Sequence, residues 1–398
     1  MDTYLALSGL SLIVLVSYVF NWISGKTKIP SVLLLMAMGA GLKPFMENLF
    51  PGGKESIGWM LGFTGTLGLV FIVLEASLDL GLAKKKIGTI RKAFNVSFAA
   101  LVVTAAAISA IFVFGYGINI ASAIAYAIPL SVISSAIAIP ASINLPVSKR
   151  EFVVYESTFS DILGILAFNY FVLAGLDLPG TIFRLVEDFS AILLLVFLFI
   201  LVMLLAMHYV NSNLKLIPIL AALLAAYSAA KIVHLPALLL VLVFGLVLRN
   251  IGALKHLKWF LNMPKLDQTT DQLKTIVVEL SFLIRTFFFT LFGYTLSLSG
   301  IEGRAFWLGA LVFAVIMVAR QFALYYLLKN NFVHELMMGP RGLVTVILFF
   351  SIPENLKIAA AGESVVYLVV ILSNFAMMVL FLFYKEPYRE TPSMLAGN

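Results

Sequence analysis

The stretch Tyr126-Ala-Ile-Pro-Leu-Ser-Val-Ile-Ser-Ser-Ala-Ile-Ala-Ile-Pro140 is apolar enough to lie in a membrane, yet prolines and serines interrupt it. A second stretch has the same character: Met338-Gly-Pro-Arg-Gly-Leu-Val-Thr-Val-Ile-Leu-Phe-Phe-Ser-Ile-Pro353. A broken membrane helix leaves backbone groups and half-helix ends that can bind ions. Kinked structural helices are the alternative, because proline and glycine are common in membrane spans. Two such stretches in corresponding positions favour a binding site near the membrane midplane.

Two other spans match each other without a gap, Ile29-Pro-Ser-Val-Leu-Leu-Leu-Met-Ala-Met-Gly-Ala-Gly-Leu-Lys43 and Leu235-Pro-Ala-Leu-Leu-Leu-Val-Leu-Val-Phe-Gly-Leu-Val-Leu-Arg249. Each has a proline near its start, a glycine in its middle and a basic residue at its end. Any two apolar helices that begin with proline share part of this likeness. An odd offset of seven spans between the two indicates opposite orientations, as in transporters built from inverted repeats.

Apolar stretches with short polar breaks continue from end to end of the chain, and 62% of its 398 residues are hydrophobic. Only 12% are charged, against about 25% in a soluble domain. The predicted fold class is an all-α polytopic membrane protein with about thirteen transmembrane helices, of which the fifth and twelfth are broken. The expected spans lie near 3–23, 29–45, 57–78, 93–115, 119–144, 152–176, 186–209, 214–231, 236–250, 273–298, 305–328, 334–352 and 363–384.

The predicted organisation is one transporter domain over 1–398, with no soluble regulatory domain. Repeat one covers 1–176, a connecting helix covers 186–209, and repeat two covers 214–384. Alternating the loops between the two sides places eighteen of the 27 Lys and Arg residues on one side and six on the other. This bias predicts an N-terminus outside and a cytoplasmic C-terminus, in a bacterial inner (plasma) membrane.

The composition also excludes several function classes. The chain has no cysteine and no histidine cluster, so thiolate chemistry and a structural metal site are not expected. No nucleophile or paired catalytic carboxylate motif is present, and we therefore expect no enzyme activity and no cofactor. The net charge of +7 is first a topology signal in a membrane chain, so no nucleic-acid partner is expected.

Asp161 is the most deeply placed acid. It lies ten residues after Glu151, about 15 Å along a helix axis, and therefore close to the membrane midplane. A carboxylate there can hold a dehydrated monovalent cation or a proton but not both, which is the minimum requirement of an antiporter. Ser157, four residues earlier, and the adjacent Ser160 are candidate oxygen ligands.

The other intramembrane charges need partners, because each costs at least about 2.5 kcal/mol near the bilayer centre. Glu156 and Arg285 are expected to form a structural ion pair. Arg341, between glycines and a proline, either neutralises the carbonyl ends of half-helices or holds a second acid. Arg320 is expected to reach the inner interface. Glu75 faces an access funnel or pairs with a lysine.

Four stretches together resemble the monovalent cation:proton antiporter superfamily, which includes the sodium/proton exchangers. They are Phe71–Leu80, Glu156-Ser-Thr-Phe-Ser-Asp-Ile-Leu-Gly164, Phe282–Gly293 and Gly339-Pro-Arg-Gly-Leu-Val344. The resemblance implies thirteen spans, with the broken fifth and twelfth helices crossing each other. It also implies a dimerisation half separate from a moving core, and alternating access of an elevator type. It also implies Asp161 as the ion-binding carboxylate and a stabilising pair of Glu156 and Arg285.

The chain departs from this family pattern at two places. Ser160 stands where the family has Asn or Asp, and this neutral residue resembles the branch linked to electroneutral exchange. Ser134 and Ser135, with Ala136, stand where many sodium exchangers have Thr-Asp-Pro, and they are included among the candidate ion ligands. The family resemblance favours sodium as the cation. Potassium is the alternative, because the Ser134-Ser135 pattern also resembles some potassium/proton members. A cation-coupled symporter of organic solutes and a channel are the competing functions.

Overall fold

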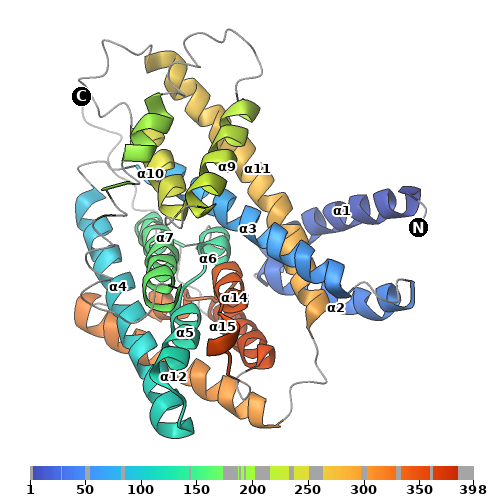
Figure 1. Cartoon of the computed structure of the whole chain (residues 1–398), viewed down its shortest axis with the longest axis vertical. Helices are drawn as coiled ribbons and strands as arrows, with labels where there is room; N and C mark the ends of the chain where they lie inside the picture. The colour runs from blue at the N-terminus through green and yellow to red at the C-terminus, as the bar shows by residue number, and fades with distance from the viewer. Residues whose placement is uncertain are drawn as a thin grey trace.

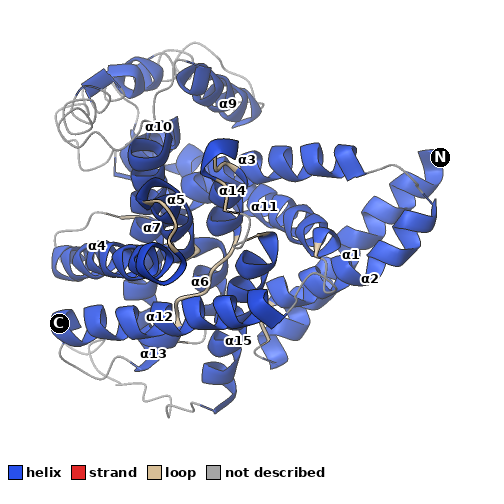
Figure 2. Cartoon of the chain, turned by 60° about the horizontal axis from the view of Figure 1, so that its bottom comes forward, coloured by secondary structure: helices blue, strands red, loops and turns tan. Residues whose placement is uncertain are grey.

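The computed structural model describes residues 3–27, 29–49, 54–81, 86–142, 145–173, 187, 190–191, 194–201, 216–232, 237–250, 263–296, 303–328, 333–358 and 362–383. The described residues form helices and loops, without a strand among them (Figure 2). This confirms the all-α fold class.

The helices follow one another along the chain as α1 (Thr3–Thr27), α2 (Ser31–Leu49), α3 (Lys54–Asp79), α4 (Ile87–Ala110), α5 (Ile120–Ser131), α6 (Ser135–Ala141), α7 (Val147–Phe168), α9 (Leu216–Ile232), α10 (Ala237–Asn250), α11 (Met263–Thr295), α12 (Gly303–Leu328), α13 (Val333–Met337), α14 (Leu343–Phe350) and α15 (Glu363–Phe383). Two π-helical turns continue α4 and α7, over Ile111–Gly115 and Asn169–Leu173, and a 3-10 turn covers Glu354–Leu356.

These elements account for twelve of the expected spans. The fifth span is α5 plus α6 and the twelfth is α13 plus α14, so both predicted breaks are present. The tenth span begins earlier than expected, because α11 already starts at Met263. Of the seventh span, only residues 187, 190–191 and 194–201 lie within the described part of the chain.

Two glycines bring helices of distant sequence close together. A Cβ atom on Gly39 of α2 would lie 2.0 Å from the Thr290 carbonyl oxygen of α11. A Cβ atom on Gly245 of α10 would lie 1.8 Å from the Ser77 hydroxyl of α3. Only a residue without a Cβ allows such approaches. Gly39 and Gly245 are the glycines that the two matching spans align, and each packs its span against a different long helix.

The broken helices lie in the middle of the bundle, surrounded by α3, α4, α7, α11, α12 and α15 (Figures 1 and 2). One hydrophobic cluster fills this region, and it includes the fully buried Phe112, Phe168, Phe288 and Phe289. A second cluster joins α3, α9, α10 and α11. In contrast, α1 and α2 extend from one side of the bundle (Figure 1).

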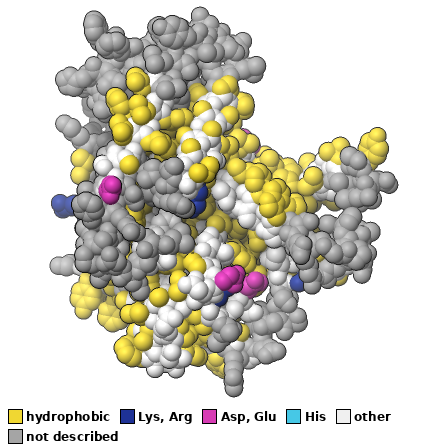
Figure 3. Space-filling view, in the orientation of Figure 1, with side chains coloured by type: hydrophobic (Ala, Val, Ile, Leu, Met, Phe, Trp, Pro, Cys, Tyr) yellow, Lys and Arg dark blue, Asp and Glu magenta, His cyan; other side chains and the backbone are white. Residues whose placement is uncertain are grey.

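Among the described residues on the face shown in Figure 3, hydrophobic side chains are numerous and charged side chains are few. Exposed residues of α1 include Leu7, Leu15 and Trp22. Among the described helices, six are long and apolar enough to cross a membrane by length and composition, and four shorter apolar helices accompany them.

Candidate ion-binding site

The two helix breaks touch each other through the main chain. The Ser134 N–H donates to the Pro340 carbonyl with an N···O distance of 2.9 Å. Gly342 lies against the first break, because a Cβ atom there would be 2.8 Å from the Ser134 hydroxyl and 2.4 Å from Ile137 Cδ1. The fifth and twelfth spans therefore cross at their interruptions, as the sequence predicts.

Asp161 lies on α7 beside this crossing and is only 3% exposed. Its Oδ2 accepts a 3.0 Å hydrogen bond from the Ser135 N–H at the start of α6. Its Oδ1 is buried without a hydrogen-bond partner among the described residues, as are the hydroxyls of Ser134 and Ser135. Buried polar oxygens normally have partners, so three unpaired oxygens at one crossing suit a bound cation or proton.

The two serines on α7 have different surroundings. The Ser160 hydroxyl accepts a 2.9 Å hydrogen bond from the Ile133 N–H, and so binds the first break directly. The Ser157 hydroxyl donates to the Val153 carbonyl of its own helix, at 2.8 Å. Both residues are buried. Their assignment as ion ligands stays a prediction.

Arg341 connects the second break to the end of α5. Its guanidinium donates to the Leu130 carbonyl at 3.0 Å, to the Ser131 carbonyl at 3.3 Å and to the Gly339 carbonyl at 2.6 Å. Leu130 and Ser131 are the last residues of α5, where carbonyl groups lack helical partners and carry partial negative charge. Arg341 thus contacts carbonyls at the end of a half-helix, and its role in charge compensation stays a prediction.

Helix α15 holds the backbone of Arg341. The Ser373 hydroxyl accepts from the Arg341 N–H, and the Asn374 side-chain amide donates to the Arg341 carbonyl, both at 2.9 Å. The sequence reasoning did not select Ser373 and Asn374. They are adjacent polar residues in an otherwise apolar span, and that was the available signal.

The predicted ion pair between Glu156 and Arg285 is wrong, because Glu156 binds Arg320. The Arg320 guanidinium donates to the two Glu156 carboxylate oxygens at 2.8 and 3.1 Å, and both side chains are 1% exposed. Arg320 also donates to the carbonyls of Glu335 and Leu336. Arg320 therefore does not reach the interface as expected. It is a buried partner that joins α7, α12 and α13.

Arg285 instead binds two other groups. Its Nη1 donates to the Ala136 carbonyl on α6 at 3.0 Å, and its Nη2 lies 3.9 Å from Glu75 Oε2 on α3. Glu75 thus has an arginine as its charged neighbour and not a lysine. The lysine of this region, Lys274, forms an ion pair with Asp79, one turn further along α3.

A cavity of about 620 Å³ lies between α1, α2, α3 and α11 on one side and α6 with the start of α7 on the other. Three acids line it, Glu75, Asp79 and Glu279, together with Arg285 and Arg150. The cavity also reaches Ala136. Ala136 follows Ser135, and the Ser135 N–H donates to Asp161. Glu75 therefore lines this cavity, and its role in access stays a prediction.

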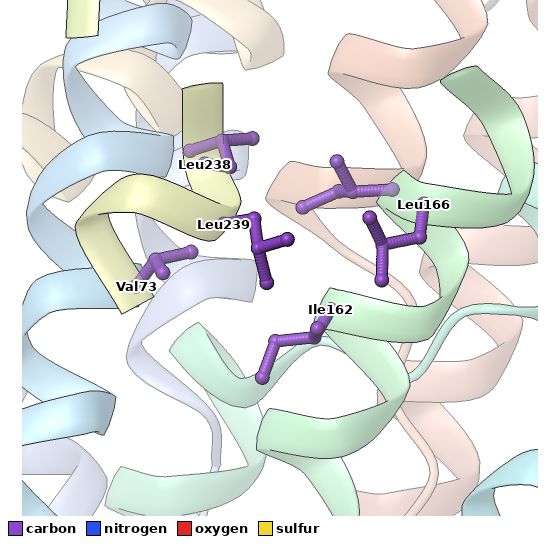
Figure 4. A pocket seen from close by; sticks show the side chains of 6 residues that line it. Val73, Ile162, Leu166, Leu238 and Leu239 are labelled. Carbon is purple, nitrogen blue, oxygen red and sulfur yellow. The ribbon is translucent and has the colours of Figure 1, made fainter. Parts of the chain in front are cut away.

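Apolar side chains of α3, α7 and α10 meet next to Asp161 in the sequence of α7. Val73 of α3, Leu238 and Leu239 of α10, and Ile162 and Leu166 of α7 surround a small apolar pocket (Figure 4). Ile162 directly follows Asp161 in the chain. An apolar constriction of this kind resists the passage of water and ions.

Known proteins with a similar fold and a matching sequence family indicate what this site belongs to. No curated protein matches the chain. The structure of the sodium proton antiporter MjNhaP1 from Methanocaldococcus jannaschii at pH 8 is similar, with a TM-score of 0.73, 20% identity, and coverage of 95% of this chain and 100% of that one. An electron-microscopy structure of the same antiporter has a TM-score of 0.66 and 19% identity, covering 97% and 100% of the two chains. At these identities the likeness shows a shared fold.

The sequence itself matches the family described as sodium/hydrogen exchanger, transmembrane, over residues 11–384. This match spans nearly the whole chain and includes the two breaks, Asp161 and Arg341. The chain therefore belongs to the transmembrane sodium/hydrogen exchanger family and is an integral membrane protein.

Proposed function

We propose that this chain exchanges one monovalent cation, Na⁺ in preference to K⁺, for one proton at Asp161. The observation that carries the proposal is a buried carboxylate at the crossing of two broken helices, with one oxygen unpaired beside two unpaired serine hydroxyls. Cation and proton are the substrates, and the residues of the crossing are their binding site.

Competition at one carboxylate couples the two substrates. A buried ionised carboxylate without a counter-ion is costly, so the side chain is neutralised either by a proton or by a cation. The described residues around Asp161 provide no ion pair to it. Its neighbour Ser160 is neutral and bonds to the Ile133 N–H, so it adds no second titratable group. One carboxylate and one neutral neighbour support an electroneutral exchange.

The difference between the two sides of the site supports alternating access. The cavity lies at the C-terminal ends of α1, α3 and α6, which the charge bias assigns to the cytoplasm. The apolar pocket lies toward the end of α7 and the start of α10, which the same bias assigns to the outside. This arrangement supports an inward-facing state. In the other state the group that carries α7 would move past α3 and α10, and the apolar contacts would open.

The orientation, location and assembly belong to the same proposal. The N-terminus lies outside and the C-terminus in the cytoplasm of a bacterial inner membrane. Repeat one covers residues 1–176 and repeat two covers 214–384. The exposed apolar face of α1 suits contact with lipid or with a second copy in a homodimer. No cofactor is part of the proposed cycle.

Proton flux in inside-out membrane vesicles tests the proposal. Adding Na⁺, Li⁺ or K⁺ to vesicles with an acid interior should release protons, with the largest response to Na⁺. Asp161→Asn should abolish this response, whereas Asp271→Asn, which changes an exposed acid, should leave it intact. Unchanged exchange by Asp161→Asn would refute the assignment.

The same vesicles separate the remaining alternatives. An electroneutral exchanger responds to a pH gradient and not to an imposed membrane potential, so a strong effect of potential in liposomes would refute the one-to-one stoichiometry. A cation-coupled symporter would require an organic solute for proton release. A channel would give flux that does not saturate with cation concentration.

A further inference from the structure

Two helices contact the two breaks with the same pattern of side chains. On α7, the Ser160 hydroxyl accepts from the Ile133 N–H of the first break at 2.9 Å. On α15, the Ser373 hydroxyl accepts from the Arg341 N–H of the second break, also at 2.9 Å. In each case a buried serine satisfies a main-chain donor that a helix interruption leaves without a partner.

The residue after each serine also binds its break, but with opposite hydrogen-bond polarity. Asp161 accepts from the Ser135 N–H at 3.0 Å. Asn374 donates to the Arg341 carbonyl at 2.9 Å and to the Val370 carbonyl at 2.8 Å. Helices α7 and α15 are the sixth and thirteenth spans, which correspond under the predicted inverted repeat. Ser373–Asn374 thus corresponds to Ser160–Asp161 in order, and in each pair both side chains bond to main-chain groups of a break.

A continuous set of hydrogen bonds links Asn374 to the ion-binding crossing. Asn374 and Ser373 hold both backbone groups of Arg341. The Arg341 guanidinium in turn holds the Leu130 and Ser131 carbonyls at the end of α5. The chain then passes directly from Ser131 through the break to Ser135, the donor to Asp161.

We propose that Ser373 and Asn374 are positioning residues for exchange, the counterpart in repeat two of Ser160–Asp161, and that they hold Arg341 in place. This proposal rests on the proposed function. A neutral amide suits this place because it can donate to a carbonyl, whereas an ionised carboxylate can only accept. The second half of the crossing thus has a fixed donor where the first half has a titratable acid.

The first test replaces the side-chain amide. Asn374→Ala removes the donor to the Arg341 carbonyl, and we expect an increase of about fivefold in the apparent KM for Na⁺, as for loss of one hydrogen bond. The matched control is Asn250→Ala, because the Asn250 amide also donates to a carbonyl four residues earlier, Leu246, and to a separate segment at Leu80. The control should leave the KM for Na⁺ within twofold of the wild type.

The second test keeps the size of the side chain. In Asn374→Asp, a protonated carboxyl can still donate to the Arg341 carbonyl, but an ionised one repels it. We therefore expect a KM near that of the wild type at acidic pH and a defect that grows as the pH rises. The Asn374→Ala defect should keep the same ratio to the wild type at every pH.

The outcomes separate this inference from the proposed function. Equal KM changes in Asn374→Ala and Asn250→Ala, or a KM for Na⁺ within twofold of the wild type in Asn374→Ala, would overturn the positioning role. An Asn374→Asp defect that is constant with pH would also overturn it. If the wild-type chain itself gave no cation-driven proton flux, the proposed function would be refuted instead.

Discussion

Arg320 and Glu156, which lie 164 residues apart in the sequence, form a buried pair joined by two N–H···O bonds of 2.8 and 3.1 Å. The fork of the guanidinium matches both carboxylate oxygens, and this bidentate geometry gives the strongest form of such a contact. The pair connects α7, which carries Asp161, to α12. It therefore fixes the orientation of the proposed site from one side.

Breaking this pair should destabilise the protein strongly. Glu156→Gln leaves the Arg320 charge buried without its partner, which we expect to cost about 3–5 kcal/mol. The measurement is thermal unfolding of the purified protein in detergent, where the midpoint should fall by several degrees or more. A midpoint equal to that of the wild type would contradict the structural role of the pair.

The surface pair of Lys86 and Glu151 is the control, because its N···O distance is a similar 2.7 Å while both side chains are partly exposed. Glu151→Gln should cost at most about 1 kcal/mol. The hydrogen bond to the Glu151 carboxylate raises the pKa of Lys86 above its usual value. The small contribution of this pair is therefore complete at neutral pH and disappears as the pH rises through the raised pKa of Lys86.

A methyl group at Gly342 should separate the two breaks. In Gly342→Ala the new Cβ would lie 2.4 Å from Ile137 Cδ1 and 2.8 Å from the Ser134 hydroxyl. A displacement of about 1 Å at the site should reduce the exchange rate by about a hundredfold. Gly88→Ala is the control, since a Cβ there meets nothing within 4 Å. Vesicle proton flux, corrected for the amount of protein in the membrane, measures both.

Gly39→Ala and Gly245→Ala should both destabilise the protein, but a second substitution should restore the stability of only Gly245→Ala. Gly39→Ala meets the main-chain carbonyl of Thr290, so we expect a loss of about 1–3 kcal/mol that no second substitution restores. Gly245→Ala meets the Ser77 side chain, and the added change Ser77→Gly should recover most of the loss. Gly41→Ala, with open space around it, is the control. Thermal unfolding compares the variants, and a rescue of Gly39→Ala by any change at Thr290 would contradict the contact.

Competition between Na⁺ and protons at Asp161 determines how the apparent KM for Na⁺ changes with pH. A protonated Asp161 cannot bind Na⁺, so the apparent KM for Na⁺ should rise as the pH falls, by up to about tenfold per pH unit, while the maximal rate changes less. Proton flux at a series of Na⁺ concentrations and pH values measures this slope. A KM for Na⁺ that stays constant between acidic and alkaline pH would mean that cation and proton bind at separate groups.

Much of the fold could be predicted because membrane spans leave strong local signals. The break at residues 338–342 contains Gly339, Pro340 and Gly342, which do not favour a continuous helix. The break at residues 132–134 lies between Pro129 and Pro140, which are inside α5 and α6, so the prolines predict an interruption in this stretch but not its exact position. The burial of Asp161 could be predicted from its distance to Glu151 along one helix, while its depth in the membrane stays a prediction. Both inferences use only neighbours in the sequence.

The partner of Glu156 could not be predicted in the same way. In the sequence, Arg285 and Arg320 both have mainly apolar neighbours. The depth of a residue along its helix does not indicate which face of α11 or α12 contacts α7. That choice depends on packing between distant helices. Ser373 and Asn374 were missed for a related reason. Serine and asparagine often bond within membrane helices, so two adjacent polar residues in an apolar span do not by themselves indicate contact with a distant segment.

The hydrogen bond from the Ser134 N–H to the Pro340 carbonyl is made by main-chain atoms only. A survey that replaces every side chain with alanine would pass over it, because each variant keeps the same N–H and the same carbonyl. The contact can be removed by a residue that lacks the donor, so proline at position 134, or an ester in place of this amide, would reveal it. Tolerance of position 134 to ordinary substitutions would therefore not mean that the position is unimportant.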